Sequence, residues 1–347
     1  MLLETYDWGL EARTLQLLFG LGLGLVFGVA AQITRFCLRR AVAGDRAERG
    51  PAAAIWLTAF ATAIAAFQMA QAFGFVAIED HRFLASDIAV LAIVIGGVAF
   101  GAGMVLTRGC VSRLTVLSAT GNMRAATVLI VFAVTAHAML KGVLSPVRTS
   151  LGAFTVDVPF ASLADLPGGA ALCVAVAAIA AILTIRRFRP APSHLLLGAV
   201  IGLVPVAGWA TTSVLLFDEF DPLAVQSAAF TLPWSDTLFW VIASTAVPAG
   251  FGTGFIGGIL AGSFASAALR GELQAAAFEN AKQTGRYTLG GILMGFGGVL
   301  AGGCTVGAGL SGASSLSLAA LLALASVIAG AWAVSRAVNP SAVAVPA

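Results

Sequence analysis

Residues 291–312 read GILMGFGGVLAGGCTVGAGLSG, and this stretch shows which kind of fold the chain adopts. It carries no charged side chain and is long enough to cross a bilayer, which takes about 20 apolar residues as a helix. Gly291 and Gly295 are four residues apart, a spacing that places both on one helix face and lets another backbone approach closely. The stretch is therefore typical of a tightly packed membrane helix that breaks near Cys304.

The composition of the whole chain agrees with a membrane location. Of its 347 residues, 59% are hydrophobic and 10% are charged, whereas soluble domains carry about 25% charged residues. Glycine contributes 40 residues, well above the usual share of about 7%, which favours close helix contacts and broken helices. The sequence predicts an all-α polytopic membrane protein. The formal net charge of +3 is too small to indicate a nucleic-acid partner.

We predict a single transmembrane permease domain over residues 1–347, with about nine transmembrane helices. The predicted spans lie near 15–36, 52–78, 88–119, 125–144, 166–186, 195–216, 237–269, 287–312 and 315–335. The acidic residues before the first apolar run argue against a cleaved signal peptide.

The loops between these spans fall into two alternating groups by charge. Loops 38–50, 186–189 and 270–286 are rich in Arg and Lys, whereas the loops between them carry mainly Asp and Glu. Because cytoplasmic loops of membrane proteins hold the excess of Arg and Lys, we predict that the N-terminus lies outside and the C-terminus inside the cell.

Two predicted spans are too long or too irregular to form one straight helix. The span 88–119 is interrupted by Thr107-Arg108-Gly109-Cys110, and the span 237–269 by Pro248-Ala249-Gly250. Non-helical backbone at membrane depth is tolerated only where protein or a water-filled cavity covers it. We therefore expect short re-entrant half-helices at these breaks.

A pair of glycines followed by a cysteine occurs three times with identical spacing. The copies are Gly24-x3-Gly28-x8-Cys37, Gly97-x3-Gly101-x8-Cys110 and Gly291-x3-Gly295-x8-Cys304. Two further segments keep the glycines without the thiol, with Thr211 and Ala267 at the cysteine position. Internal repeats are common in transporter folds, so we predict a pseudo-symmetric transporter.

The sequence around the three cysteines resembles the YeeE/YedE family of sulfur-compound permeases. The segments that carry this resemblance are RFCLRRA at 35–41, TRGC at 107–110 and GGCTVGAGLSG at 302–312. The resemblance implies a bundle of long and short re-entrant helices in a bacterial inner membrane. In that membrane, the orientation given by the loop charges makes the N-terminus periplasmic and the C-terminus cytoplasmic. The resemblance also implies a central path for thiosulfate along Cys37, Cys110 and Cys304, and a small cytoplasmic sulfurtransferase as partner.

The residues around the cysteines indicate how such a path binds a dianion reversibly. Neutral thiols are weak donors with a polarizable sulfur, and half-helix N-termini supply oriented N–H groups. We expect Gly109, Gly303 and Thr305 to support the anion near the backbone. Arg108 and Arg113 either attract the anion or reach the cytoplasmic face, where they bind lipid phosphate.

The remaining polar and sulfur-containing residues receive simpler interpretations. Cys173 lies in a plain apolar run and is expected to be a packing residue. Arg39 and Arg40 are interpreted as topology determinants. The absence of a CxxC pair, and of Met or His clusters, predicts no metal site and no cofactor, and we do not expect an enzyme.

Two alternative functions stay open at this point. A membrane thiol oxidoreductase would use a close pair of cysteines, and although the nearest two are 73 residues apart in sequence, they could still meet in space. A transporter of another sulfur or selenium compound, or of a soft metal ion held by three thiolates, is the second alternative.

Overall fold

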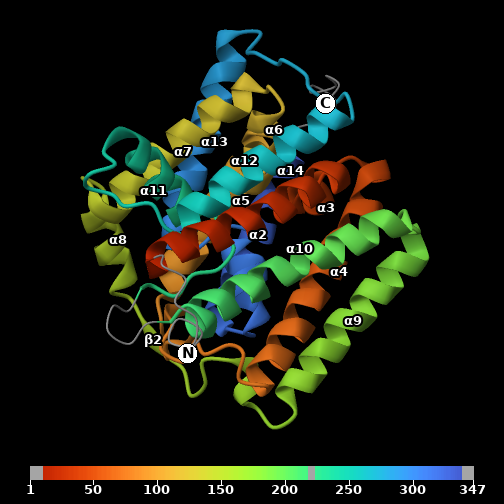
Figure 1. Ribbon diagram of the computed structural model, residues 1–347, viewed down its shortest axis with the longest axis vertical. Helices are drawn as coiled ribbons and strands as arrows, with labels where there is room; N and C mark the ends of the chain where they lie inside the picture. The colour runs from red at the N-terminus through yellow and green to blue at the C-terminus, as the bar shows by residue number, and fades with distance from the viewer. Residues whose placement is uncertain (1–10, 218–222, 338–347) are drawn as a thin grey trace.

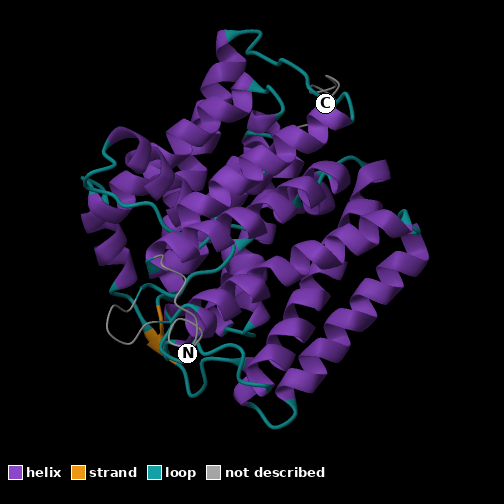
Figure 2. Cartoon of the chain, viewed as in Figure 1, coloured by secondary structure: helices purple, strands orange, loops and turns teal. Residues whose placement is uncertain are grey.

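The computed structural model describes residues 11–217 and 223–337, and almost all regular structure in them is helical (Figure 2). The two strands described, β1 (Asp87–Ile88) and β2 (Val156–Asp157), form one short antiparallel ladder. The predicted all-α polytopic fold is confirmed. The two chain ends, whose sides of the membrane the sequence predicts, lie outside the described residues.

Figure 1 shows the helices, which differ widely in length. The long helices are α2 (Ala12–Thr34), α4 (Arg46–Ala72), α5 (Val90–Leu106), α7 (Met123–Lys141), α9 (Gly169–Phe188), α10 (Pro192–Ala210), α12 (Phe251–Leu269), α13 (Ala281–Leu300) and α14 (Leu318–Ala337). The shorter elements are α3 (Leu38–Ala43), α6 (Val111–Ala119), α8 (Ser145–Gly152), α11 (Thr231–Ile242), the 3-10 turns η1 (Arg82–Leu84) and η2 (Leu163–Asp165), and the π-helical segments η3 (Thr211–Leu215) and η4 (Gly307–Gly312).

Eight segments of the described chain are long and apolar enough to cross a membrane, and they match eight of the nine predicted spans. The ninth, near 287–312, is divided between α13, a turn at Cys304 and η4. The predicted span 237–269 likewise contains two helices, α11 and α12, separated at the expected break. The segment 38–50, interpreted as a loop, is instead mostly helical, because α3 and the start of α4 occupy it.

The predicted glycine pairs bring helix backbones into direct contact. They lie where α2 packs against α12, α5 against α14, α13 against α7 and α10 against α4. A Cβ atom at Gly28 would lie 2.5 Å from the carbonyl oxygen of Ile259, and one at Gly295 would lie 2.7 Å from that of Phe132. Both distances are too short for any side chain, so glycine is required at these crossings.

The four contacts relate two halves of the chain by inverted pseudo-symmetry. Helices α2, α4, α5 and α7 correspond in order to α10, α12, α13 and α14, because the pairs α2/α12 and α5/α14 repeat as α10/α4 and α13/α7. The halves run in opposite directions, since α2 and α5 end where α10 and α13 begin, at the same end of the molecule. Inverted repeats of this kind are a common plan of secondary transporters.

Apolar side chains cover the outer surface of the bundle. On α9, at the edge of the bundle in Figure 1, Leu172, Val176, Ile179 and Leu183 are all exposed. A large continuous apolar surface is costly in water but suits the hydrocarbon core of a bilayer. The chain is a multi-pass membrane protein.

Close packing at the glycine pairs makes a testable prediction on α2. We expect Gly24→Leu to destabilise the fold by about 1–3 kcal/mol, the usual cost of overpacking, because the new side chain would meet the backbone of α12. Gly22→Leu is the matched control on the same helix, since nothing lies within 4 Å of a Cβ there. Melting temperatures in detergent measure both, and equal values for the two variants would contradict the packing.

Candidate functional site

Each of the three repeated cysteines follows a helix end with the same backbone conformation. The residue two positions before the thiol has a positive φ in every case: 51° at Arg35, 60° at Arg108 and 73° at Gly302. This left-handed conformation is uncommon for residues with a side chain and ends helices. The sequence repeat is therefore also a structural repeat, in which a helix stops and the cysteine begins a new segment.

The two glycine pairs without a cysteine lack this break. Thr211 continues α10 directly into the π-helical η3, and Ala267 lies inside the unbroken α12. The helix break and the thiol thus occur together at Cys37, Cys110 and Cys304.

Cys37 and Cys110 form a pair, although they come from different repeats. Their sulfur atoms are 3.5 Å apart, and the Cys110 sulfur is 3.1 Å from the Ser112 hydroxyl. Both cysteines are buried, with 3% and 1% of their surface exposed. The breaks after α2 and α5 therefore create one shared sulfur site.

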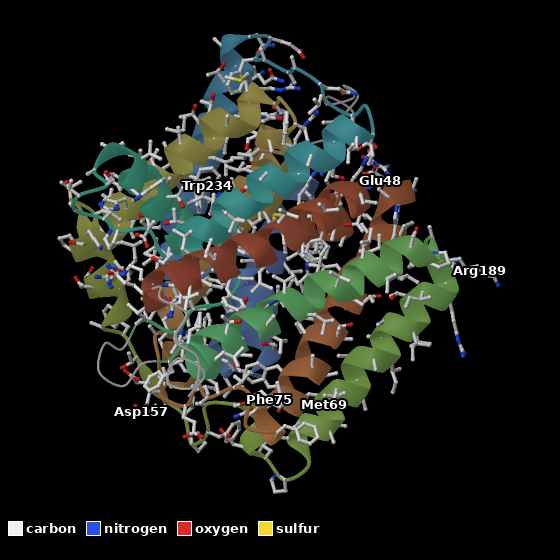
Figure 3. The ribbon with its side chains drawn as sticks, in the orientation of Figure 1. Glu48, Met69, Phe75, Asp157, Arg189 and Trp234 are labelled. Carbon is white, nitrogen blue, oxygen red and sulfur yellow. The ribbon has the colours of Figure 1, made fainter. Side chains whose placement is uncertain are left out.

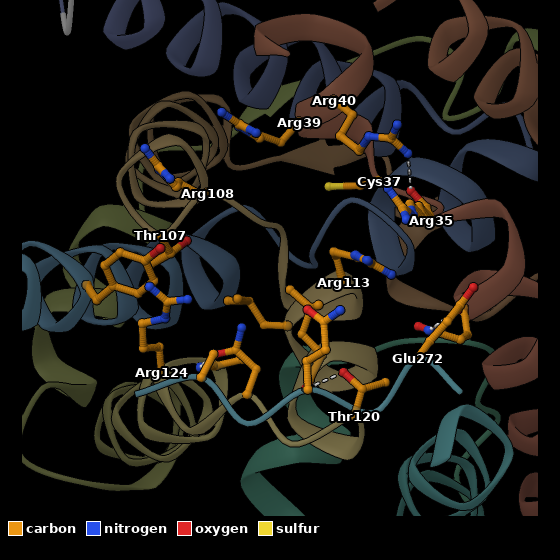
Figure 4. Close-up of a pocket in the computed structure, with 18 of the residues that line it drawn as sticks. Arg35, Cys37, Arg39, Arg40, Thr107, Arg108, Arg113, Thr120, Arg124 and Glu272 are labelled. Atoms are coloured by element: carbon orange, nitrogen blue, oxygen red, sulfur yellow. Dashed lines mark hydrogen bonds between the residues drawn. The ribbon is translucent and has the colours of Figure 1, made fainter. Parts of the chain in front are cut away.

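An arginine-rich cavity of about 310 Å³ opens beside this pair, with Cys37 in its wall. Figure 4 shows the guanidinium groups arranged around the Cys37 thiol. The charged residues lining it are Arg35, Arg39, Arg40, Arg108, Arg113 and Arg124, together with Glu48 and Glu272. Positive charge thus dominates the cavity, and this favours an anion as its ligand.

The two acidic residues are neutralised by arginines. Arg40 forms an ion pair with Glu48 at 3.3 Å. Hydrogen bonds of 3.1 and 3.0 Å from Arg270 lower the pKa of the Glu272 carboxyl, which also accepts from Gln32. Their negative charges therefore do not cancel the remaining arginines.

Two of the cavity arginines have buried donor atoms without a hydrogen-bond partner. These atoms are Nη1 of Arg113 and Nε of Arg39. Arg124, by contrast, pairs with Glu279 at 3.7 Å. Unsatisfied buried donors are costly, and an anion bound in the cavity would satisfy them.

Cys304 lies in the other half of the molecule and belongs to a separate site. It is 1% exposed, and its sulfur accepts a hydrogen bond of 3.3 Å from the Gly307 amide. A Cβ at Gly303 would lie 2.7 Å from the Ala308 nitrogen, so the turn requires glycine there. Cys304 shares the buried core with Cys37 but does not line the arginine-rich cavity.

Buried aromatic rings connect the two sulfur sites. Phe27 lies 6.4 Å from Phe36, the neighbour of Cys37, and 5.7 Å from Phe230, measured between ring centroids. The backbone of Phe230 faces the Cys304 thiol. Phe27 and Phe230 are fully buried, so the structure is closed at this level.

The other predicted site residues lie as follows. Arg108 and Arg113 line the cavity, Gly109 lies between α5 and α6, and Thr305 is buried beside Cys304. Cys173 is partly buried, where α9 packs against α4.

The sequence did not single out Arg35 as a site residue, and it explained Arg39 and Arg40 by topology. The structure places all three in the cavity wall. A signal was present, because the first two repeats share the pattern Arg-x-Cys-x-x-Arg, at 35–40 and 108–113. The third repeat has glycines at both arginine positions.

Comparison with known proteins agrees with this architecture. The chain matches the sulphur transport family over residues 27–333. It belongs to that family. The resemblance to the YeeE/YedE permeases is thereby confirmed.

A similar protein is the thiosulfate transporter TsuA of Escherichia coli (strain K12), 32% identical over 132 residues. The aligned region covers 38% of this chain and 34% of that protein. The chain thus aligns with about a third of the length of this relative.

Proposed function

We propose that the protein takes up thiosulfate across the bacterial inner membrane, passing the anion along Cys37, Cys110 and Cys304. The observation that carries this proposal is a pair of thiols 3.5 Å apart, one of which, Cys37, lines an arginine-rich cavity. Membership of a sulphur transport family and the partial likeness to a thiosulfate transporter support the same cargo.

The chemistry of the cavity suits reversible binding of a soft dianion. Guanidinium groups attract the charge, and the free donors of Arg113 and Arg39 offer hydrogen bonds to oxygen. Neutral thiols donate weakly through S–H and offer a polarizable partner for the terminal sulfur. Weak sites in series allow the anion to leave as well as enter, which conduction requires.

Because the two halves run in opposite directions, their cysteine sites would serve opposite ends of the transport path. The cavity at Cys37 opens at the end that carries the basic loops, which the positive-inside rule assigns to the cytoplasm. Cys304 belongs to the half that runs the other way. Movement of one half against the other would open each site in turn. A small cytoplasmic sulfurtransferase would receive the anion at the arginine-rich end, and lipid would cover the apolar flanks.

The sulfur pair also supports a second candidate, a membrane thiol oxidoreductase. Two thiols 3.5 Å apart could form a disulfide after local movement. Quinone-dependent disulfide formation in purified protein would favour this function. Metal transport has less support, since the described residues contain no group of three or more His, Cys, Asp or Glu placed to hold a metal ion.

Uptake of radiolabelled thiosulfate by proteoliposomes tests the proposal. We expect saturable uptake that unlabelled thiosulfate competes away and that sulfate and selenite compete away poorly. Sulfate lacks the soft terminal sulfur that the thiols are proposed to recognise. Competition by sulfate equal to that by unlabelled thiosulfate would show that the thiols do not select the cargo.

A further inference from the structure

A guanidinium group lies at the break before Cys304, although the local sequence has no arginine there. In the first two repeats the left-handed residue before the cysteine is itself an arginine, Arg35 or Arg108, whereas in the third it is Gly302. Arg82, from η1 in the segment between α4 and α5, donates through Nη2 to the Gly302 carbonyl at 2.7 Å. A residue 220 positions away thus brings the positive charge that this repeat lacks.

The first repeat makes the same contact at the other sulfur site. There Arg40 donates through Nη1 to the carbonyl of Arg35 at 3.0 Å, and Arg40 lines the cavity beside Cys37. In both repeats a guanidinium group binds the carbonyl of the left-handed residue two positions before a thiol. Arg82 therefore contacts the backbone before Cys304 in the same way that Arg40 contacts the backbone before Cys37.

Arg82 lies at the end of the molecule opposite the arginine-rich cavity. Helix α4 starts beside that cavity, where Glu48 lines it, and ends at Ala72 before the segment that contains Arg82. Figure 3 shows Glu48 towards one end of the bundle, with Met69 and Phe75 towards the other. Arg82 is therefore at the end where thiosulfate would enter.

The charge of Arg82 is not neutralised by a neighbouring carboxylate in the described parts of the chain. Glu79 and Asp80 in the same segment are exposed and form no ion pair with it. Burial and the Arg82 charge lower the pKa of His81 to about 4, so His81 is neutral at physiological pH. Arg82 is then the cation of this segment.

Arg82 is accessible to solvent but lies close against the surrounding protein. Its side chain is exposed, yet the surrounding protein lowers its pKa by desolvation, although arginine stays protonated at any physiological pH. The guanidinium lies over the Phe83 ring at 5.2 Å, and the Phe83 carbonyl accepts a hydrogen bond of 2.5 Å from Ser317. Hydrogen bonds to Gly302 and from Ser317 thus hold this segment beside the turn that precedes Cys304.

We propose that Arg82 is the outer anion-binding residue of the transport path, which captures thiosulfate and delivers it to Cys304. Guanidinium has five N–H donors, so the bond to Gly302 leaves others for two oxygens of the anion. A fixed cation at the mouth also raises the local concentration of a dianion. This inference rests on the proposed function.

Uptake kinetics of Arg82→Gln, Arg82→Lys and Arg148→Gln in proteoliposomes test the inference. Arg148, in α8, is the matched control, because its Nε also donates to a backbone carbonyl, that of Met139 in the last turn of α7, at 3.2 Å. We expect Arg82→Gln to raise the half-saturating thiosulfate concentration about tenfold, the loss of one charge-assisted contact, with the maximal rate retained. Arg82→Lys should lie in between and Arg148→Gln should match the wild type.

Salt provides a readout that a purely structural role would not change. Added salt should raise the half-saturating concentration of the wild type and affect Arg82→Gln less. Unchanged half-saturation in Arg82→Gln, or an equal increase in Arg148→Gln, would overturn the role of Arg82 while leaving the proposed function intact. A loss confined to the maximal rate and melting temperature would also overturn it. Absence of saturable uptake in the wild type would instead overturn the proposed function, and the role of Arg82 with it.

Discussion

Replacement of Cys110 or Cys304 by alanine is expected to abolish thiosulfate uptake while the protein still folds and inserts. Both thiols are buried at helix breaks, and alanine keeps their small size while removing the S–H donor and the polarizable sulfur. We expect at least a tenfold loss of initial rate, about 1.4 kcal/mol or more. Radiolabel uptake into proteoliposomes that contain equal amounts of protein measures the effect.

Cys173→Ala is the matched control for these variants. Its thiol packs between α9 and α4, away from the helix breaks, so uptake should stay at the wild-type level. Circular dichroism and melting temperature should be similar for all three variants. Uptake close to wild type in both Cys110→Ala and Cys304→Ala would refute transfer along the thiols.

A second measurement distinguishes a redox function of the Cys37 and Cys110 pair from a function in transport. If the Cys37 and Cys110 pair acts as a redox couple, a disulfide should form between the two sulfur atoms when a physiological quinone is added. If the pair acts as a binding site, the thiols stay reduced throughout transport. Intact-mass analysis after alkylation of the denatured protein distinguishes the two, because both buried thiols are then accessible and only a disulfide protects them.

The helices and the helix breaks at the three cysteines could be predicted from the sequence because each depends on local pattern. Long apolar runs predict spans, and the fixed distance from Gly24, Gly97 and Gly291 to a cysteine indicates a repeat. The breaks were visible as polar or helix-breaking residues inside apolar runs. These features are properties of single segments and need no knowledge of the partners of each helix.

The meeting of Cys37 with Cys110 and the contact of Arg82 with Gly302 could not be predicted in the same way. Both depend on how segments far apart in the sequence pack, at separations of 73 and 220 residues. The inverted relation between the halves was equally hidden, because the spacing from glycine to cysteine is the same whichever way a helix crosses the membrane. The direction in which α13 runs follows only from the structure, in which one end of this helix lies beside the arginine-rich cavity.

The arginines of the cavity show why charge near a predicted site is hard to interpret from sequence alone. Positive residues at the cytoplasmic ends of helices are expected on topological grounds, and this explanation was sufficient for Arg39 and Arg40. The structure adds a fact that topology does not require, namely buried nitrogen atoms on Arg39 and Arg113 with no partner. A topology determinant would instead have its charged group in water.

Arg113→Gln is expected to reduce thiosulfate transport about tenfold without destabilising the protein. The Arg113 side chain has a buried donor without a partner and forms no ion pair with a carboxylate in the described chain. Burying an uncompensated charge costs folding free energy, so its removal should leave the melting temperature equal to or above that of the wild type. Transport should fall because the anion loses a charge-assisted contact near Cys110.

Arg124→Gln is the control within the same cavity. Arg124 also lines the wall, but it pairs with Glu279 at 3.7 Å, and such partly exposed pairs contribute about 0–1 kcal/mol. We therefore expect a small effect on both transport and stability. Uptake and melting temperature are measured for both variants. A lower melting temperature with unchanged uptake in Arg113→Gln would mean that Arg113 supports the fold. Lower uptake with an equal or higher melting temperature in Arg113→Gln would show that Arg113 serves anion transport at a cost to folding stability.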